Sequence, residues 1–203
     1  MAIVGLRLQK ELNGISVLEL DDIKPKKNIA TTRSFEKNYS KIEDLIERVS
    51  TFAVTCAEKL RRQKSCCNSI MVFIHTNGHR SDLPQYSKNI VMQLPYASNS
   101  SIDLSDYAVK GLMLIFKEGY QYKKAGVIVM DFTPEENMQA SLFDSPNPKH
   151  SSLMATMDKI NKSIGRQKLK LASQDLDRTW KMKQEKLSKR YTTRLDEIIT
   201  LNL

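Results

Sequence analysis

Few side chains in this sequence have the types and spacing of a catalytic or metal site. Cys66 and Cys67 are adjacent in the chain, and His75 and His79 follow a few residues later. A structural zinc site needs cysteines in Cys-x-x-Cys pairs, which this spacing does not provide. Three cysteines are also an odd number, which cannot form a disulfide framework. The sequence therefore predicts reduced thiols, no metal site and no catalytic residues.

An apolar pair in a polar, proline-bounded loop is the next candidate. Leu142 and Phe143 end the stretch Gln139-Ala140-Ser141-Leu142-Phe143, which is flanked by Glu135, Glu136 and Asp144. Burying either side chain would gain roughly 1.5 to 3 kcal/mol. We therefore expect the pair to occupy a pocket, either on this domain's own surface or on a partner.

The order of residues in this stretch is similar to the peptide that binds the bacterial sliding clamp. In that peptide a glutamine, here Gln139, hydrogen-bonds the rim of the clamp pocket. A small polar residue, here Ser141, follows, and an apolar pair, here Leu142 and Phe143, fills the pocket. The resemblance implies weak, roughly micromolar binding that becomes useful through avidity with DNA contacts.

Composition sets the class of protein. The chain has 203 residues, 40% of them hydrophobic, which suffices for one medium-sized domain. Its formal net charge of +9 favours a polyanion partner, but it fits a solvated charged surface equally well. Charged residues interrupt the opening segment, and no stretch reaches the roughly 20 apolar residues that span a bilayer. The sequence therefore predicts a cytoplasmic protein with no membrane partner.

Hydrophobic periodicity predicts an α+β fold, a four-stranded antiparallel-type sheet with two helices on one face. Short apolar runs predict strands at 29–35, 70–74, 90–94 and 126–132, the third of them ended by Pro95. Helical spacing predicts one helix from a capping box at Ser40–Glu43 to Gln63, and another from about Leu104 to Gly119.

The flanking regions are predicted to be smaller. A short helix should run from Val4 to Leu12, and one more, formed around Leu153 to Ile160, should end at Gly165. The remaining tail is basic and cannot build a core of its own. Its main anchor is expected to be a packing cluster of Trp180, Met182 and Tyr191.

Four segments resemble, in the same order, the C-terminal half of the UmuC family of Y-family translesion DNA polymerases. The opening of the chain, through Gly14 and Ile15, is similar to the end of that family's thumb. The four segments are Thr31–Phe35, Glu58–Arg61, Gly119–Val127 and Ser188–Arg194.

The resemblance implies a division of the chain into a DNA-binding domain and its attachments. Residues 28–133 would be the little finger, whose Thr32, Arg33, Ser34, Lys123 and Lys124 lie against the backbone of primer-template DNA. Such phosphate contacts are blind to sequence. The other parts implied are the end of the thumb helix region (1–20), a hinge (21–27), a clamp-binding tether (134–148) and a basic C-terminal accessory region (149–203).

Polymerase chemistry needs palm carboxylates that hold two Mg²⁺ ions. Ser101-Ile102-Asp103 is similar to a palm motif, but the family has Glu at the next position and this chain has Leu104. We therefore interpret the segment as a cap that leads into a helix. The palm and fingers are expected upstream of Met1, so that this fragment has no cofactor and Mg²⁺ belongs to the parent polymerase.

The family also implies a role and partners. These are lesion bypass in the SOS response, UmuD′ and RecA filaments as further partners, and association with the nucleoid. The chain departs from the family pattern at Glu36, where Gly is usual, at Lys189, where Pro is usual, and at Leu195, where Trp is usual. The alternative is a free-standing RRM-like module, which would need aromatic residues on its sheet; the predicted last strand has none before Phe132.

Overall fold

A computed structural model describes residues 3–17, 26–138, 147–165, 167–174 and 187–198. The helices are α1 (Ile3–Leu12), α2 (Ile42–Arg62), α3 (Ser101–Ile115) and α4 (Pro148–Ser163). The strands are β1 (Ile29–Tyr39), β2 (Ser65–Thr76), β3 (Ser87–Ser98) and β4 (Tyr122–Pro134). Two short 3-10 turns, η1 (Glu135–Asn137) and η2 (Leu195–Glu197), complete the described elements.

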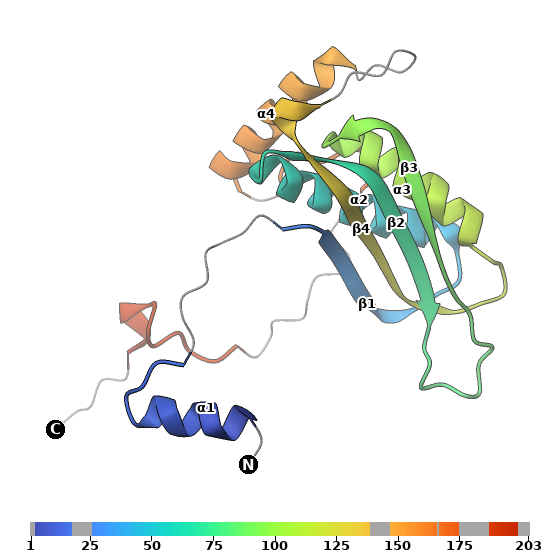
Figure 1. Cartoon of the computed structure of the whole chain (residues 1–203). Coiled ribbons are helices and arrows are strands. Elements are labelled where there is room, and N and C mark those ends of the chain that lie inside the picture. The colour runs from blue at the N-terminus through green and yellow to red at the C-terminus, as the bar shows by residue number, and fades with distance from the viewer. Residues whose placement is uncertain (1–2, 18–25, 139–146, 166, 175–186, 199–203) are drawn as a thin grey trace.

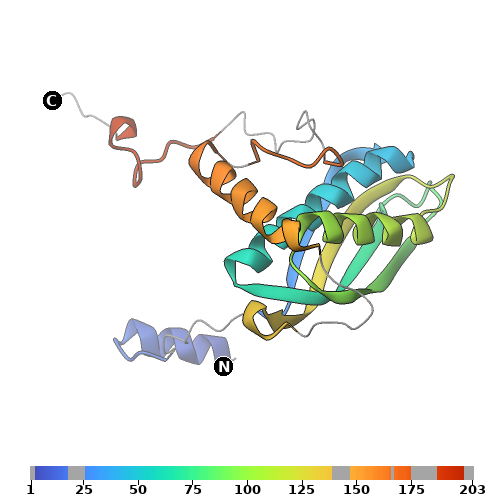
Figure 2. The same cartoon turned by 90° about the horizontal axis from the view of Figure 1, so that it is seen from above.

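The four strands form one sheet in the order β1-β4-β2-β3, and every neighbouring pair is antiparallel. Helices α2 and α3 lie side by side behind the sheet in Figure 1, and the view from above in Figure 2 shows them as a second layer. The α+β class, the sheet and the one-sided helix layer predicted from the sequence are confirmed.

The core lies between the sheet and the two helices. Helix α2 buries an apolar stripe at helical spacing, and α3 does the same beside it. Each strand contributes alternate residues, because successive side chains point to opposite faces of a sheet. The core includes Leu45, Val49, Phe52 and Leu60 of α2, Leu104, Ala108 and Leu112 of α3, Ile70, Val72 and Ile74 of β2, and Val127 and Val129 of β4.

Helix starts differ from the sequence prediction. Lys41, and not Ser40, is the N-cap of α2, and no side chain makes a cap hydrogen bond there, so the predicted capping box is wrong. Helix α3 begins at Ser101 rather than near Leu104, because the Ser100 hydroxyl accepts a hydrogen bond from the Asp103 amide at 3.4 Å.

Strand and helix ends also differ. Strand β3 continues through Pro95 to Ser98, which the sheet tolerates because β3 is an edge strand. Helix α3 ends at Ile115, and Gly119 supplies a positive φ of 88° in the turn that leads to β4. Strand β4 begins at Tyr122, four residues before the predicted start.

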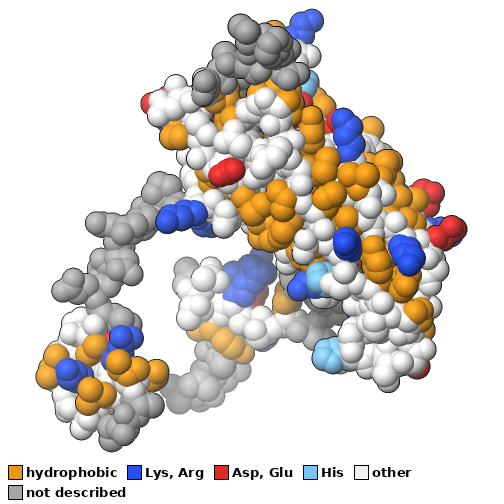
Figure 3. Space-filling model, turned by 45° about the vertical axis from the view of Figure 1, so that its right-hand side comes forward, with side chains coloured by type: hydrophobic (Ala, Val, Ile, Leu, Met, Phe, Trp, Pro, Cys, Tyr) orange, Lys and Arg blue, Asp and Glu red, His pale blue; other side chains and the backbone are white. Residues whose placement is uncertain are grey.

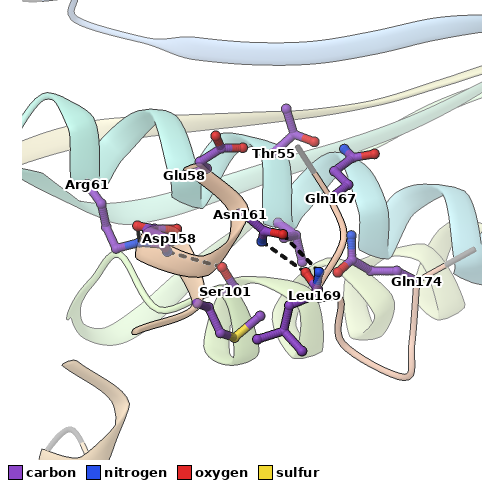
Figure 4. A pocket seen from close by; sticks show the side chains of 11 residues that line it. Thr55, Glu58, Arg61, Ser101, Asp158, Asn161, Gln167, Leu169 and Gln174 are labelled. Carbon is purple, nitrogen blue, oxygen red and sulfur yellow. Dashed lines mark hydrogen bonds and ion pairs between the residues drawn. The ribbon is translucent and has the colours of Figure 1, made fainter. Parts of the chain in front are cut away.

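Helix α4 and residues 167–174 lie against the outer side of the helix layer. Met154 and Met157 of α4 are buried there, so α4 packs its apolar residues against the main domain. Figure 4 shows the small pocket between these segments, with Arg61 of α2 joined to Asp158 of α4. Beyond it, the hydroxyl groups of Ser50 and Ser173 lie 2.7 Å apart.

Helix α1 makes no buried contact. Its apolar side chains are largely exposed, with Val4 at 71% and Leu12 at 79%. The helix itself and its end at Asn13 and Gly14 agree with the sequence prediction. Among the described parts of the chain, no helix is both long and apolar enough to cross a membrane.

Candidate nucleic-acid interface

The sheet face away from α2 and α3 is the open face. Strand alternation and register place four sets of residues on it, and no Asp or Glu is among them. The sets are Ala30, Thr32 and Ser34 of β1, Lys124, Gly126, Ile128 and Met130 of β4, Ser69, Met71, Phe73 and His75 of β2, and Ser87, Asn89, Val91 and Gln93 of β3.

The five residues expected to contact DNA come together along the β1 side of the sheet. Ser34 pairs with Lys124 and Thr32 pairs with Gly126, so residues about 90 positions apart in sequence become neighbours. We call Thr32, Arg33, Ser34, Lys123 and Lys124 the β1 edge cluster. The sheet register, which the sequence alone does not specify, makes these residues one cluster.

The cluster lies on both faces of the sheet, on the edge strand β1 and on the neighbouring strand β4. Arg33 pairs with the buried Ala125 and therefore points to the helix side, whereas Ser34 and Lys124 share the open face. The Lys123 ammonium lies 3.2 Å from the carbonyl oxygen of Glu36. Because β1 is at the edge of the sheet, a ligand that runs along this edge can reach both faces.

Glu36 is accommodated by a bulge in β1. The pairing with β4 shifts between Ser34 and Tyr39, and Glu36 lies inside that irregular stretch. Its carboxylate accepts a hydrogen bond from the Tyr39 hydroxyl and lies 3.7 Å from the guanidinium of the buried Arg48. These two partners direct the carboxylate toward its own strand and α2, so the unusual acid at this position has defined partners.

The same contacts shift two pKa values. Burial raises the pKa of Tyr39 to about 12, and its hydrogen bond to Glu36 adds to the effect. Burial alone would raise the pKa of Glu36, but the hydrogen bond from Tyr39, a backbone hydrogen bond and the charges of Arg48 and Lys37 together outweigh it and hold that pKa below its usual value. Arg48 Nη2 donates to the Tyr39 hydroxyl at 2.5 Å, and the guanidinium stacks on the Tyr39 ring at 3.9 Å.

An aromatic side chain that sequence reasoning did not single out lies at the centre of the open face. Phe73 of β2 pairs with Gly126, and its ring covers that glycine. A Cβ atom at position 126 would lie 2.5 Å from the ring and 2.6 Å from the Thr32 methyl group. The available signal was the glycine within the apolar run of β4, which often marks a close approach.

Asp103 has a structural role. Its Oδ2 accepts a hydrogen bond from Ser98 Oγ at 2.8 Å, and its Oδ1 lies 3.2 Å from His150 Nδ1 of α4. The Ser100 hydroxyl lies 3.1 Å from the same histidine nitrogen. These contacts support the interpretation of the segment as a helix cap rather than as part of a polymerase palm.

The cysteines and histidines do not assemble into a metal site. Cys56, Cys66 and Cys67 are buried free thiols, and burial raises the pKa of Cys66 to about 11. His75 Nδ1 lies 2.8 Å from the Ser87 hydroxyl. In the described ranges, no three His, Cys, Asp or Glu side chains are arranged to hold a metal ion.

Several predicted features lie outside the described residues. Gln139, Ser141, Leu142 and Phe143 are among them, as are Trp180 and Met182. The structure does describe the chain on either side of the clamp-motif segment. The Glu135 amide donates to the Lys64 carbonyl at 3.0 Å, and the Asn147 side chain caps α4 by accepting from the Lys149 amide at 3.0 Å.

In the C-terminal region, the backbone carries a 3-10 turn at Leu195–Glu197, and Arg194 pairs with Glu197 at 3.2 Å. Lys189 and Tyr191 are exposed. Nothing in these contacts explains the departures from the family pattern at Lys189 and Leu195.

The fold and its interface define a class of protein, an α+β sheet domain with one uncovered sheet face and a polar, basic edge. Residues 26–142 match the impB/mucB/samB family C-terminal domain, and residues 151–201 match a domain of unknown function, DUF4113. The chain therefore belongs to the impB/mucB/samB family.

Individual relatives agree with this assignment. The chain is 36% identical to the protein ImpB of Salmonella typhimurium over 195 residues, which are 95% of this chain and 46% of ImpB. It is 35% identical to UmuC of Salmonella typhimurium strain LT2 over 196 residues, 95% of this chain and 46% of UmuC. The match to MucB of Escherichia coli is 35% over 190 residues, 92% of this chain and 44% of MucB. The chain spans about half the length of these relatives.

Among solved structures, the insertion ternary complex of Dbh DNA polymerase aligns with a TM-score of 0.42 and 16% identity. The alignment covers 63% of this chain and 35% of that one. The resemblance to the UmuC family noted in the sequence is confirmed by the family match. The strand order differs from that of an RRM, because an RRM has its first strand at the centre of the sheet and β1 here is at the edge.

Proposed function

We propose that this chain is the DNA-holding C-terminal part of a UmuC-type translesion polymerase and that it grips primer-template DNA along the β1 edge cluster. The observation that carries the proposal is the pairing of Ser34 with Lys124 in a chain of this family. It places the hydroxyl group of Ser34, on the edge strand β1, beside the ammonium group of Lys124, on the neighbouring strand β4.

The chemistry of the cluster suits phosphate oxygens. Lys124 and Ser34 would contact one stretch of backbone from the open face, while Arg33 and Lys123 would reach it from the helix side and the bulge. Such contacts carry no sequence information, which suits an enzyme that must act wherever damage occurs. The defined partners of Glu36 keep its charge directed toward Tyr39 and Arg48.

The second part of the proposal concerns attachment to the replication machinery. Gln139, Ser141, Leu142 and Phe143 are proposed to bind the bacterial sliding clamp. Both flanks of this segment are held to the domain, by the Glu135 amide on one side and by the packing of α4 on the other. A peptide tethered at both ends would hold the clamp on the same molecule as the β1 edge cluster, which raises the effective concentration of each contact.

The wider role is proposed from the family. It includes lesion bypass in the SOS response in the bacterial cytoplasm, at the nucleoid, with UmuD′ and the RecA filament as partners. The Mg²⁺ ions of polymerase chemistry do not fit the residues described here, since these form no cluster of metal ligands. We assign the catalytic carboxylates to the part of the relatives that this chain does not span.

The test is a salt titration of DNA binding by the whole chain, with labelled primer-template DNA and fluorescence anisotropy. A grip on about three to five phosphates gives a log–log slope of about −2.7 to −4.5. Lys124→Ala should reduce the slope by about one and weaken all sequences equally. Lys110→Ala is the matched control, because Lys110 is exposed on α3 and pairs with Asp106. Binding that does not depend on salt would refute the phosphate grip.

A further inference from the structure

The sequence pattern of the central strands does not match their surroundings. Ile70 to Ile74 is an unbroken apolar run, and so is Val127 to Met130 of β4. Unbroken runs are typical of strands that are covered on both faces. Here α2 and α3 cover one face, and within the described residues no helix or strand covers the other.

The open face therefore carries an apolar surface. Figure 3 shows hydrophobic side chains gathered over the strands on this side of the molecule. The surface consists of Met71 and Phe73 of β2, Val91 of β3, and Ile128 and Met130 of β4. Val91 is 48% exposed, so the surface continues to the edge of the sheet.

Phe73 is held in a defined position on this surface. Its ring rests on Gly126, where the missing Cβ leaves room for it, and reaches the Thr32 methyl group. The His75 ring packs edge to face against it, with the ring centroids 5.0 Å apart. An aromatic ring supported in this way on a strand is preorganised to receive another flat, apolar face.

Positive charge lies next to the ring. The Lys124 ammonium is 5.9 Å from the centroid of Phe73. The open-face residues named above from the strand pairing include no Asp or Glu. A ligand with a flat apolar group and a nearby anion matches both features, and a nucleotide is such a ligand.

We propose that Phe73 is a stacking site for an unpaired base of single-stranded DNA, with Lys124 holding the adjoining phosphate and Met71, Ile128 and Val91 extending the apolar contact to the next base. The proposal deepens the proposed DNA grip and rests on it. The proposed ligand is unpaired DNA, because in a duplex both faces of a base are already stacked on its neighbours.

The experiment compares two oligonucleotides of about 12 nucleotides, a length that single-stranded DNA sites commonly cover. One is a labelled oligothymidylate, and the other has abasic residues at its central positions, so that the phosphates are kept and the bases removed. The whole chain is titrated into each at fixed salt. The wild type should bind the thymidylate about tenfold more tightly than the abasic oligonucleotide.

Variants assign that difference to the ring. Phe73→Leu should bring the two affinities together without changing the abasic one, which also shows that the variant is folded. Phe73→Tyr should restore the difference, because the aromatic face is kept. Lys124→Ala should weaken both oligonucleotides equally, and Met113→Ala, a truncation of an exposed side chain on α3, should change neither.

Three results would overturn the proposal. Equal wild-type affinity for both oligonucleotides would remove the stacking site and leave the phosphate grip standing. If Phe73→Leu lost as much affinity for duplex DNA as for the oligothymidylate, the open face would bind duplex DNA rather than unpaired bases. Failure to bind either oligonucleotide or primer-template DNA would refute the proposed DNA grip itself.

Discussion

The guanidinium group of Arg61 donates two parallel hydrogen bonds to the carboxylate of Asp158, from Nε at 2.7 Å and from Nη2 at 2.8 Å. Nη1 of the same group donates to the Asn99 carbonyl at 2.7 Å. One side chain of α2 thus joins the start of α3 to α4. The bidentate geometry makes this the strongest described polar contact between the main domain and α4.

The Arg61–Asp158 pair predicts a selective loosening of α4. Asp158→Ala should expose α4 to solvent while the main domain keeps its stability to within about 1 kcal/mol, since Arg61 retains its bond to Asn99. Hydrogen exchange measured peptide by peptide would show faster exchange in 148–163 and unchanged exchange in α2. Uniform acceleration over both segments would contradict the prediction. Asp106→Ala, which removes an exposed ion pair on α3, is the control.

Gly126 predicts a steric cost on the open face. Gly126→Ala should lower the free energy of unfolding by about 1 to 3 kcal/mol, because the added Cβ overlaps the Phe73 ring and the stiff Thr32 side chain. Phe73→Leu in the same chain should recover part of the loss, since the overlap with the ring is removed. Urea unfolding of the two single variants and the double variant measures this coupling. Strictly additive losses would show that the ring does not rest on the glycine.

The sequence predicted the parts of this fold that depend on local pattern. Helix α2 was predicted because its apolar residues repeat at helical spacing over 21 residues, and this periodicity can be seen without knowing the tertiary structure. The extension of β3 through Pro95 was missed, because only the sheet order shows that this strand is at an edge. The helix layer on one face was predicted, but the apolar surface on the other face was missed for a related reason. An apolar run such as Ile70 to Ile74 indicates burial on two faces and cannot show that one of them is open.

In the candidate site, too, the sequence identified individual residues but not their spatial arrangement. Segment resemblance identified Ser34 and Lys124 separately, and only the register between β1 and β4 pairs them. Arg33 and Ser34 lie on opposite faces because neighbouring residues of a strand alternate, and the pairing of Arg33 with the buried Ala125 shows that Arg33 is on the helix side. The partners of Glu36 depend on a β-bulge and on Arg48 of another element, so no local pattern could have indicated them.

Tyr39 predicts a loss of stability in alkali. Its pKa is about 12 in the folded chain against an ordinary value of 10.0, so the unfolded chain ionises first. The stability due to this group is complete below about pH 10 and is lost as the pH rises toward about 12. Tyr39→Phe should have a shallower decline across that window, measured by urea unfolding at successive pH values. A parallel decline in both proteins would show that other groups, such as Tyr122, dominate.

Glu36 predicts a loss of stability in acid. Its pKa is lowered from the ordinary 4.5, so the folded chain keeps the carboxylate charged at a pH where the unfolded chain takes up a proton. The stabilisation is present above that value and is lost as the pH falls below it. Glu36→Gln should remove this part of the acid dependence, and Glu43→Gln, at an exposed position of α2, is the matched control. Identical acid profiles for wild type and Glu36→Gln would contradict the role of Tyr39 and Arg48 as its partners.

The clamp motif predicts a separation of two binding activities. Leu142→Ala combined with Phe143→Ala should abolish the roughly micromolar binding to bacterial sliding clamp, because the two side chains supply most of the apolar contact with the pocket. Binding to primer-template DNA alone should be unchanged, since the β1 edge cluster lies in another part of the chain. Fluorescence polarisation with a labelled peptide of residues 136–146 measures the first effect, and the whole chain measures both. The DNA affinities of the variant and the wild type should differ only when clamp is present on the DNA, because avidity requires both contacts in one molecule. Unchanged clamp affinity in the double variant would remove the tether from the proposed function and leave the DNA grip intact.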